Sequence, residues 1–567
     1  MPITLEQFVH TPRIAYFSME IGLRSEIPTY SGGLGMLAGD TLRSAADLSI
    51  PLVGVTLASR NGYFRQVLDE FGRQTELPDP WEPGDWAIPL PAKISVPVAD
   101  RDVWVQAWLY GLSGASGYQV PVLLLDTQLP ENGPEDRRIT DQLYGDGIEY
   151  RLTQEIVLGI GGARMLQALG FKVHTYHMNE GHSALLALEL LRRDERRPDR
   201  MEPHGDVYDT ARVREQCLFT THTPVEAGHD QFDYPLVDRL LARFMDLNEI
   251  RRLAGNQRLN MTRLALRLSG YVNGVAKTHA EVSRQMFPEV HVHAVTNGVH
   301  PGTWTAPAVQ RLFDRYIPAW RFEPDMLVRA DQIPPQETWS AHTEAKAALL
   351  DAVRRLTGVS LDPEVATLGF ARRMTAYKRP DLLFSDLGRL KTIAQRHPIQ
   401  IVMAGKAHPN DSGGKALIER LFRMRDELSG AIRMVFLPNY NMHLGHLLTS
   451  GVDLWLNNPL RPLEASGTSG MKAAFNGVPN LSVLDGWWME GCIEGVTGWA
   501  VGNGGGAESN GGDAQALYAT LENKVLPLFY DDRAGWIRVM QGAIAKNAYY
   551  FNSHRMMRRY ATAAYIR

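Results

Sequence analysis

Short apolar, β-prone segments alternate with longer helical segments along this chain, and the alternation limits the folds that are open to it. In the first half the β-prone segments are 13–20, 51–58, 120–126, 171–179 and 216–222. A long helical run, 150–170, lies among them. Short strands interleaved with helices favour an α/β fold with a parallel sheet covered on both faces.

The same pattern restarts after a polar, proline-rich stretch near 300–340. The second set of expected strands is 364–371, 399–405, 431–438, 451–457 and 478–485. Two α/β lobes with a cleft between them are the simplest interpretation, and ligands of such folds bind at the carboxyl ends of the strands. The final segment, 536–567, is expected to be helical and to cross back onto the first lobe. The glycine-rich segment 502–513 is expected to be a surface loop.

Composition excludes several classes of protein. The chain has 567 residues, of which 44% are apolar and 22% charged, as in an ordinary globular protein rather than a disordered one. Its net charge of −4 gives no overall basic footprint for nucleic acid. No window reaches the roughly 18 apolar residues of a membrane helix, and the N-terminus lacks the pattern of a signal peptide. With only two cysteines and no disulfide framework, a soluble cytoplasmic protein is expected.

Two motifs could hold an anion. In SGGLGMLAGD (31–40), adjacent glycines let backbone amides approach a ligand before a helix begins, although a plain tight turn explains them equally well. In GFARRMTAYKRP (369–380), four cations crowd the end of an expected strand: Arg372, Arg373, Lys378 and Arg379. They would repel one another unless an anion or solvent relieved them, so a phosphate site and a solvated basic loop both remain open.

Other motifs carry lysine, carboxylate and polar groups. RPLEASGTSGMKAAFNG (461–477) is not a Walker A loop, and Lys472 within it could be either a covalent cofactor lysine or a surface residue. HMNEGHS (177–183) and THTPVEAGH (221–229) do not match the common metal-ligand spacings, and they suit sugar hydroxyls better. TNGVHPGTW (296–304) adds Asn297 and Trp304 where the first lobe is expected to end. Each of these could also be a satisfied structural group.

Taken together and in order, the motifs resemble the α-glucan (glycogen/maltodextrin) phosphorylases, a pyridoxal 5′-phosphate-dependent family. The resemblance spans most of the chain, and EASGTSGMK is its most specific part because it is similar to the family's cofactor-lysine signature. It implies the GT-B fold, in which two Rossmann-like lobes face a central cleft. Residues 1–303 would form the glucan-side lobe and 304–540 the cofactor and phosphate side. Residues 541–567 would form the helix that crosses back.

The resemblance also assigns roles. It implies a catalytic set of Lys472, which anchors the cofactor, with Arg373, Lys378 and His222. It implies further cofactor contacts from Gly33, Thr468, Tyr440, Trp304 and Arg372. Substrate contacts would come from Asn297, Glu464, Ser466, Gly467, Tyr377, Glu180 and His182, and no metal is expected.

The implied reaction transfers a glucosyl unit from an α-1,4-glucan to inorganic phosphate with retention, releasing glucose 1-phosphate. The cofactor phosphate would act as general acid and base, since its second pKa lies near about 6. Arg373, Lys378 and the glycine-turn amides would offset the repulsion between two phosphates. The expected partners are therefore the glucan and phosphate, with neither nucleic acid nor membrane. A homodimer is possible because the relatives are commonly dimers.

The chain departs from the longer members of the family at several positions: Glu180, Arg372, Thr375, Asn441 and Ser469-Gly470. Only twelve residues precede RIAYFSMEIG, so control by phosphorylation or nucleotides at the N-terminus is expected to be lacking. Two alternatives remain. A GT-B glycosyltransferase of the glycogen synthase type would use a sugar nucleotide and would have no need of Lys472. An inactive glucan-binding protein would be expected to have lost Lys472, Arg373 or Lys378.

Overall fold

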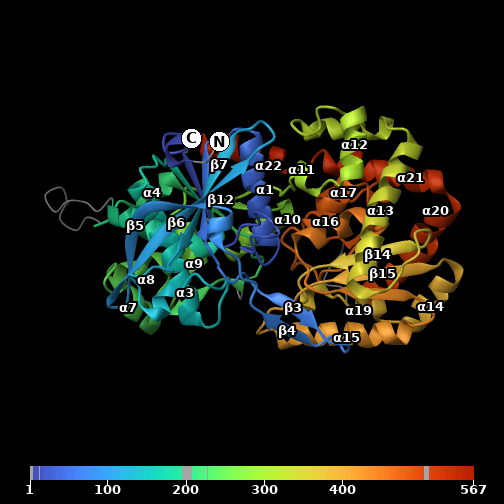
Figure 1. The fold of residues 1–567 in the computed structure, drawn as a ribbon, viewed down its shortest axis with the longest axis horizontal. Coiled ribbons are helices and arrows are strands. Elements are labelled where there is room, and N and C mark those ends of the chain that lie inside the picture. Colours follow the sequence, from blue (N-terminus) through green and yellow to red (C-terminus); the bar gives the residue numbers. More distant parts are fainter. Residues whose placement is uncertain (1–3, 12, 194–206, 226–227, 503–509, 567) are drawn as a thin grey trace.

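Two large sheets form the framework of the protein. The computed structural model describes residues 4–11, 13–193, 207–225, 228–502 and 510–566. In Figure 1 the first sheet lies in the left half of the molecule, around β5, β6 and β7, and the second lies in the right half, around β14 and β15. No helix in the described ranges is both long and apolar enough to cross a membrane.

The first sheet has nine strands in the order β13-β12-β9-β8-β1-β2-β7-β6-β5. These are β1 (Ile14–Ser18), β2 (Leu52–Leu57), β5 (Ile88–Val98), β6 (Arg101–Ser113), β7 (Gln119–Asp126), β8 (Thr175–Asn179), β9 (Cys217–Thr220), β12 (Tyr271–Gly274) and β13 (Val292–Ala294). From β13 to β7 the neighbours are parallel, whereas β6 and β5 are antiparallel additions. The prediction of a wholly parallel sheet is therefore wrong at this edge, where β6 alternates buried and outward-facing side chains, as antiparallel strands can.

The second sheet has six strands in the order β16-β15-β14-β17-β18-β19, and all neighbours are parallel. Its strands are β14 (Ala366–Ala371), β15 (Ile399–Ala404), β16 (Arg433–Leu437), β17 (Leu454–Asn457), β18 (Asn480–Val483) and β19 (Gly498–Val501). All ten strands expected from the sequence are present within a few residues.

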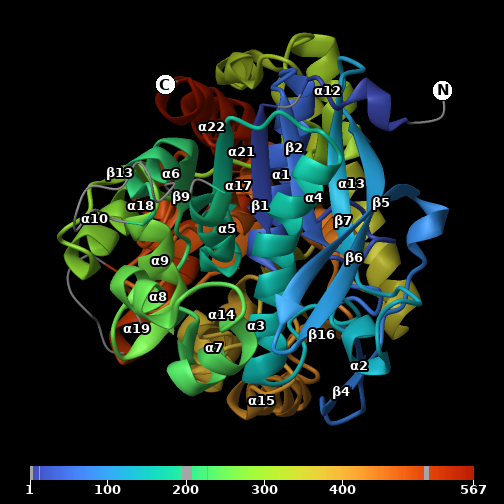
Figure 2. The same cartoon turned by 90° about the vertical axis from the view of Figure 1, so that its left-hand side faces the viewer.

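Each sheet separates two hydrophobic cores, because successive side chains of a strand point to opposite faces. On β1, Ala15 and Phe17 pack on one face and Ile14 and Tyr16 on the other. The first face is covered by α3 (Ile148–Ile156), α4 (Gly162–Ala168) and α5 (Leu185–Arg193), which lie toward the viewer in Figure 2. The other face is covered by α1 (Gly33–Asp47) and α22 (Ser553–Tyr560). The predicted helical run 150–170 is thus confirmed.

The second sheet is covered in the same way. One face packs against α13 (Pro335–Thr357) and α16 (Met442–Gly451). The other packs against α14 (Leu387–Arg396), α15 (Ser412–Leu428), α19 (Asn510–Thr520), α20 (Leu526–Asp531) and α21 (Arg533–Gly542). Of the predicted loop 502–513, residues 503–509 lie outside the described ranges, and the last four residues open α19 instead.

The C-terminal segment is helical, as predicted, and it contacts both halves. After α21 the helix continues as a π-helical stretch, Ala543–Ala548, and α22 follows. In Figure 1 the red ribbon of α22 lies beside the blue ribbon of α1, in agreement with the contacts between the two helices. Between the sheets a further core joins Met36 of α1, Trp304, Met471, Trp487 and Phe551. This core therefore combines residues from both ends of the chain.

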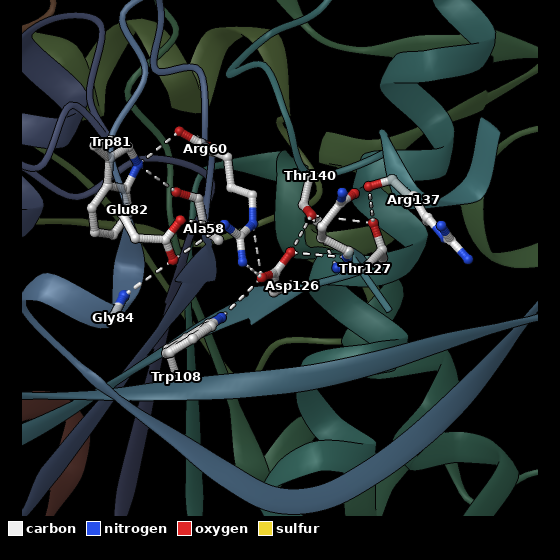
Figure 3. A network of polar contacts seen from close by, with 12 residues as sticks. Ala58, Arg60, Trp81, Glu82, Gly84, Trp108, Asp126, Thr127, Arg137 and Thr140 are labelled. Atoms are coloured by element: carbon white, nitrogen blue, oxygen red, sulfur yellow. Dashed lines mark hydrogen bonds and ion pairs between the residues drawn. The ribbon is translucent and has the colours of Figure 1, made fainter. Parts of the chain in front are cut away.

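A hairpin, β3 (Arg65–Leu68) with β4 (Gln74–Leu77), extends from the first half onto the second. The Gln66 side chain donates to the carbonyl of Gly405 at 2.9 Å and accepts from the amide of Asn439 at 2.9 Å. At the base of the hairpin, Figure 3 shows the carboxylate of Asp126 between Arg60, at 2.7 Å, and the indole N–H of Trp108, at 2.9 Å. The segment before the hairpin is thereby fixed to the first sheet, while Gln66 of β3 is bonded to loops of the second.

Candidate active site

Most of the predicted site residues line one cavity of about 360 Å³. They come from loops that follow strands of both sheets, at the carboxyl ends where α/β folds bind ligands. Those that line it are Gly33, His222, Asn297, Trp304, Arg372, Arg373, Tyr377, Lys378, Tyr440, Glu464, Ser466, Gly467, Thr468 and Lys472. Residues as far apart in the sequence as Gly33 and Lys472 are thus brought together.

Lys472 projects from α17 (Ser469–Phe475) into a buried part of the cavity. Its Nζ lies 3.5 Å from the ring centroid of Trp304, in α11 (Pro301–Trp304). The indole N–H of Trp304 in turn donates to both carboxylate oxygens of Asp40, at 2.9 and 2.8 Å. Burial lowers the pKa of Lys472 to about 8, although the negative charge of Asp40 offsets part of the effect. An amine with such a pKa is more nucleophilic at neutral pH than a surface lysine.

The cationic cluster surrounds a carboxylate. Lys378 Nζ lies 2.6 Å and Arg372 Nη2 lies 2.7 Å from the same oxygen, Oε2 of Glu464. Burial would raise the pKa of Glu464, but Arg372 and Lys378 lower it to about 2, so the carboxylate is ionised at neutral pH. Arg379 points elsewhere and pairs with Asp513 at 2.5 Å, while Arg373 is exposed on the cavity wall. Protein carboxylates therefore relieve most of the repulsion expected among the four cations.

A second carboxylate, that of Asp485, bonds to the backbone of Glu464. Asp485 follows β18 and accepts the backbone amides of Glu464, at 2.9 Å, and Gly486, at 2.8 Å. Burial raises the pKa of Asp485 to about 6. Its hydrogen bonds fix the backbone that carries Glu464.

The glycine turn is organised by Glu20, which lies just after β1. Its carboxylate accepts the amides of Ser31, at 2.6 Å, and Gly32, at 3.1 Å, and the hydroxyl of Tyr144, at 2.9 Å. These two amides are therefore already occupied, which differs from the expectation that the whole turn is open to an anion. A Cβ on Gly33 would meet only open space, whereas one on Gly35 would lie 2.6 Å from Glu20. Gly35 is thus the glycine that the close packing requires.

The opposite wall carries uncharged polar groups. Burial lowers the pKa of His222 to about 3, so the ring is neutral, and its Nε2 lies 2.7 Å from Oδ1 of Asn179. The side-chain oxygens of Asn297 and Ser466 are buried without a hydrogen-bond partner among the described residues. Such atoms suit a ligand with hydroxyl groups, because an unmade buried hydrogen bond is costly.

Two predicted substrate residues, Glu180 and His182, do not line this cavity. Glu180 accepts the backbone amide of His222 at 2.7 Å and so holds that residue in place. His182 Nε2 lies 3.3 Å from a carboxylate oxygen of Asp230. The motif NEGH therefore supports the wall instead of forming it.

Two tyrosines complete the wall near the cations. Burial raises the pKa of Tyr440 to about 12, so its hydroxyl stays protonated. The ring of Tyr377 lies under Lys378, whose Nζ is 4.5 Å from its centroid.

Among the wall residues that were not assigned from the sequence are Glu20, Tyr63 and Lys406. Lys406 donates to the carbonyl of Phe64 at 2.7 Å, and burial lowers its pKa to about 8. Glu20 is the last residue of the expected strand 13–20, and Lys406 directly follows the expected strand 399–405. Their position at strand ends was the signal that could have identified them.

Outside the cavity, Asp47, His300 and His554 lie close enough together to hold a metal ion, the one such group among the described residues. However, the backbone amide of Thr303 donates to Nδ1 of His300 at 3.1 Å, which places the proton of a neutral ring on Nε2. That nitrogen lies 2.8 Å from the carboxylate of Asp47, so its lone pair is not free for a metal. The group is better described as a hydrogen-bonded cluster.

The chain is also similar in sequence to known proteins. The Carbohydrate phosphorylase family model matches residues 246–494. The chain is 39% identical to a maltodextrin phosphorylase of Thermococcus litoralis, over 97% of this chain and 70% of that protein. It is 36% identical to a glycogen phosphorylase of Aquifex aeolicus, over 97% and 86%. It is 38% identical to a glycogen phosphorylase of Mycobacterium tuberculosis, over 97% and 70%.

Proposed function

Since the chain belongs to the α-glucan phosphorylase family, we propose that it catalyses the phosphorolysis of α-1,4-glucans and releases glucose 1-phosphate with retention. One observation carries the proposal. A single cavity combines the buried amine of Lys472, the cations around Glu464, and the unpartnered oxygens of Asn297 and Ser466. A glycogen synthase has no need of such a buried amine.

The cavity fits pyridoxal 5′-phosphate. Lys472 is the proposed attachment point, because its amine is buried and its pKa is lowered to about 8. Trp304, Tyr440, Thr468 and Gly33 lie on the wall around it and are proposed as further contacts. When bound, the cofactor supplies a phosphate monoester, whose second pKa of about 6 suits proton exchange at neutral pH.

The cations are proposed to bind the substrate phosphate. Arg373 is exposed on the wall and offers a guanidinium fork, while Lys378 and Arg372 already hold the carboxylate of Glu464. An arriving phosphate would share these two cations with Glu464, which would stabilise charge in the transition state.

The uncharged wall is proposed to hold the glucosyl unit. Asn297, Ser466 and the neutral His222 offer hydrogen bonds to sugar hydroxyls without adding charge. Glu180 accepts the backbone amide of His222 and so positions the loop that carries this part of the wall. Because water would compete with phosphate for the glucosyl unit, a closed cavity serves the reaction.

We propose the GT-B architecture, with a glucan-side lobe of residues 1–303, a cofactor-side lobe of 304–540 and a returning helix in 541–567. Two sheets with separate cores, and the packing of α22 on α1, support this division. We also propose a cytoplasmic location, which the free thiols of Cys217 and Cys492 suit. A homodimer is proposed as the assembly, and light scattering would test it.

One preparation tests the activity. The purified protein should absorb as a pyridoxal phosphate protein and should release glucose 1-phosphate from maltoheptaose only when phosphate is present. Lys472→Ala should lose both signals, whereas Lys524→Ala, which removes an exposed lysine paired with Glu494, should keep both. A colourless protein that transfers glucose from a sugar nucleotide would contradict the proposal.

Arg373→Ala separates the two phosphate-binding roles. It should keep the absorbance of the cofactor and raise the KM for phosphate, because Arg373 is proposed to contact only the substrate phosphate. An unchanged dependence on phosphate would mean that the assignment of Arg373 is wrong.

A further inference from the structure

A second cavity, of about 510 Å³, lies at the β13 edge of the first sheet. Its walls come from α6 (Thr210–Gln216), α8 (Leu247–Ala254), α9 (Met261–Arg267) and the segments beside β12 and β13. None of its lining residues lines the active-site cavity. Its volume lies in the range of small-molecule sites.

The walls of this cavity are strongly basic. Five arginines line it, together with two histidines and a single carboxylate, that of Glu289; the arginines are Arg214, Arg251, Arg252, Arg263 and Arg267. Since the whole chain carries a net charge of −4, this concentration of positive charge is local. A cavity lined by one sign of charge attracts ligands of the opposite sign.

Most of these arginines make no ion pair within the described part of the chain. Arg252 pairs with Glu249 at 2.8 Å, but in the described part of the chain the other four make no ion pair with a carboxylate. Arg214 and Arg251 donate to the backbone carbonyls of Arg267, at 2.7 Å, and Asn256, at 3.0 Å. These bonds orient two guanidinium groups without cancelling their charge.

Arg263 and Arg267 place two like charges on the same helix. They lie four residues apart on α9, where like charges face each other and destabilise the helix. Both side chains are exposed to the solvent in the cavity, and within the described ranges neither guanidinium group makes a hydrogen bond or an ion pair. An anion bound between them would relieve the repulsion.

An independent observation comes from Ser269. This residue lines the cavity and is only 2% exposed, yet its hydroxyl has no hydrogen-bond partner among the described residues. Buried hydroxyl groups are normally satisfied, so a ligand atom is the partner that this one lacks.

We propose that this arginine cavity binds a small phosphate-bearing molecule. Its phosphate oxygens would accept charge-assisted hydrogen bonds from Arg263 and Arg267, with Arg214 and Arg251 at the sides, and another of its oxygens would contact the Ser269 hydroxyl. The proposal is independent of the activity proposed above, because the two cavities share no residue.

Titration calorimetry on the full chain, at constant ionic strength, tests this proposal with four probes: inorganic phosphate, tripolyphosphate, glucose 1-phosphate and ATP. The order of affinity among them distinguishes a polyphosphate, a sugar phosphate and a nucleotide as the source of the phosphate. The double variant Arg263→Gln/Arg267→Gln should weaken binding of the preferred probe by about tenfold or more. Added salt should weaken binding in the wild type more than in the variant.

The control removes a matched pair of charges. Arg311 and Arg315 also lie four residues apart, on the exposed face of α12 (Pro307–Tyr316), and Arg311→Gln/Arg315→Gln should leave binding unchanged. Binding that is lost in Arg373→Ala but kept in the α9 double variant would belong to the active-site cavity, and it would overturn the proposal. So would failure of all four probes to bind.

Ser269→Ala provides a second test of the site if the double variant folds poorly. Removing a hydroxyl that has no partner should not lower the melting temperature. It should weaken binding of the preferred probe severalfold, and unchanged binding in a well-folded Ser269→Ala protein would count against the site.

Discussion

At the scale of single residues, the position of Lys472 makes its positive charge costly. The amine is buried beside the indole of Trp304, and the nearest opposing charge named above, Asp40, is itself buried behind that ring. Its reactivity should therefore depend on pH in a range where surface lysines stay protonated.

The reaction of the cofactor-free protein with pyridoxal phosphate measures this pKa directly. Because the neutral amine reacts and its pKa is lowered to about 8, the rate should rise about tenfold for each pH unit below that value and level off above it. In Asp40→Asn the offsetting charge is lost, so the midpoint should move to lower pH. The surface variant Asp314→Asn should keep the wild-type midpoint, and a midpoint near 10.5 in the wild type would contradict the assignment.

Glu464 acts as an internal counter-ion, and removing its charge should expose the two cations. In Glu464→Gln, Arg372 and Lys378 remain buried without it, so the melting temperature in phosphate-free buffer should fall. Added phosphate should restore more stability in this variant than in the wild type. Glu344→Gln, which breaks an exposed pair with Arg311, should show neither effect. Equal phosphate shifts in all three proteins would contradict the prediction.

Site residues were predictable where they stood in recognisable sequence motifs. Roles that depend on a partner far away in the sequence were much less predictable. Lys472 and Arg373 stood in motifs that resemble a family, so the sequence could assign them roles, and those roles stay predictions. The pairing of Lys378 with Glu464, 86 positions away, could not be read from either motif. Neither could the exclusion of Glu180 and His182 from the wall, since only packing decides which side of a loop faces a cavity.

At the scale of elements, a buried cluster fastens the last helix to the first half. Asp47, at the end of α1, accepts from His300 at 2.8 Å and lies 3.3 Å from Nε2 of His554 in α22. Burial would raise the pKa of Asp47, but the hydrogen bonds from His300 and His554 hold it well below its usual range. Burial also lowers the pKa of His300. Protonation of either group is thus disfavoured in the folded state.

His554→Ala should loosen α22 more than the rest of the molecule. Amide exchange in 553–560 should speed up relative to exchange in β14, because the cluster anchors that helix. In the wild type the same region should lose protection as the pH falls below about 6.5, since the lowered pKa of His300 makes stability decline on the acid side. Equal exchange in His554→Ala and in the exposed variant Arg559→Ala would contradict this role.

The hairpin β3–β4 is one of the elements that join the two halves through hydrogen bonds. Gln66→Ala would leave the carbonyl of Gly405 and the amide of Asn439 without their partner, at a cost of about 2–4 kcal/mol. Urea denaturation measures the loss. Arg65→Ala changes the exposed neighbour on the same strand and should alter stability by no more than about 0.5 kcal/mol. Similar values for the two variants would mean that the hairpin does not bear on stability.

The elements that the sequence did not predict share a physical feature. β3 and the antiparallel strands β5 and β6 interleave outward-facing residues with buried ones, and β4 has no buried side chain, so all four lack the continuous apolar runs that identified the parallel strands. β12, β13 and β19 are each four residues or fewer, too short for a clear pattern. The strands that lay in continuous apolar runs were predictable, including β16 at the edge of the second sheet.

At the scale of the whole molecule, the C-terminal segment makes the two halves depend on each other. Met557, fully buried in α22, packs in the core of the first sheet, while Trp536 of α21 packs in the core of the second. The chain between them contributes to the core that joins the sheets. A substitution that destabilises one core should therefore also destabilise the other.

Met557→Ala should lower the denaturation midpoint reported by both halves. The expected cost is about 2–5 kcal/mol, as for other buried methionines. Amide exchange at β14 reports on the second half, and exchange at β1 reports on the first. Two separate transitions, with only the first half destabilised, would show that the halves unfold independently.

The fold of the whole molecule was predictable from the repeated pattern of strands, but the geometry between its halves was not. That geometry depends on Gln66, Met36 and Phe551, whose partners lie hundreds of positions away. No local signal marks such residues, since an apolar or amide side chain gives the same pattern in any core.

The hairpin restricts how the two sheets can move. Gln66 of its first strand is bonded to the loops after β15 and β16, and the segment before that strand is held by Arg60 and Asp126 beside the first sheet. The same stretch carries Tyr63 on the cavity wall and Phe64, whose carbonyl binds Lys406. A change in the angle between the sheets would therefore be a rotation about this hairpin. The cavity could widen on the side away from the hairpin while the wall around Tyr63 and Lys406 kept its shape.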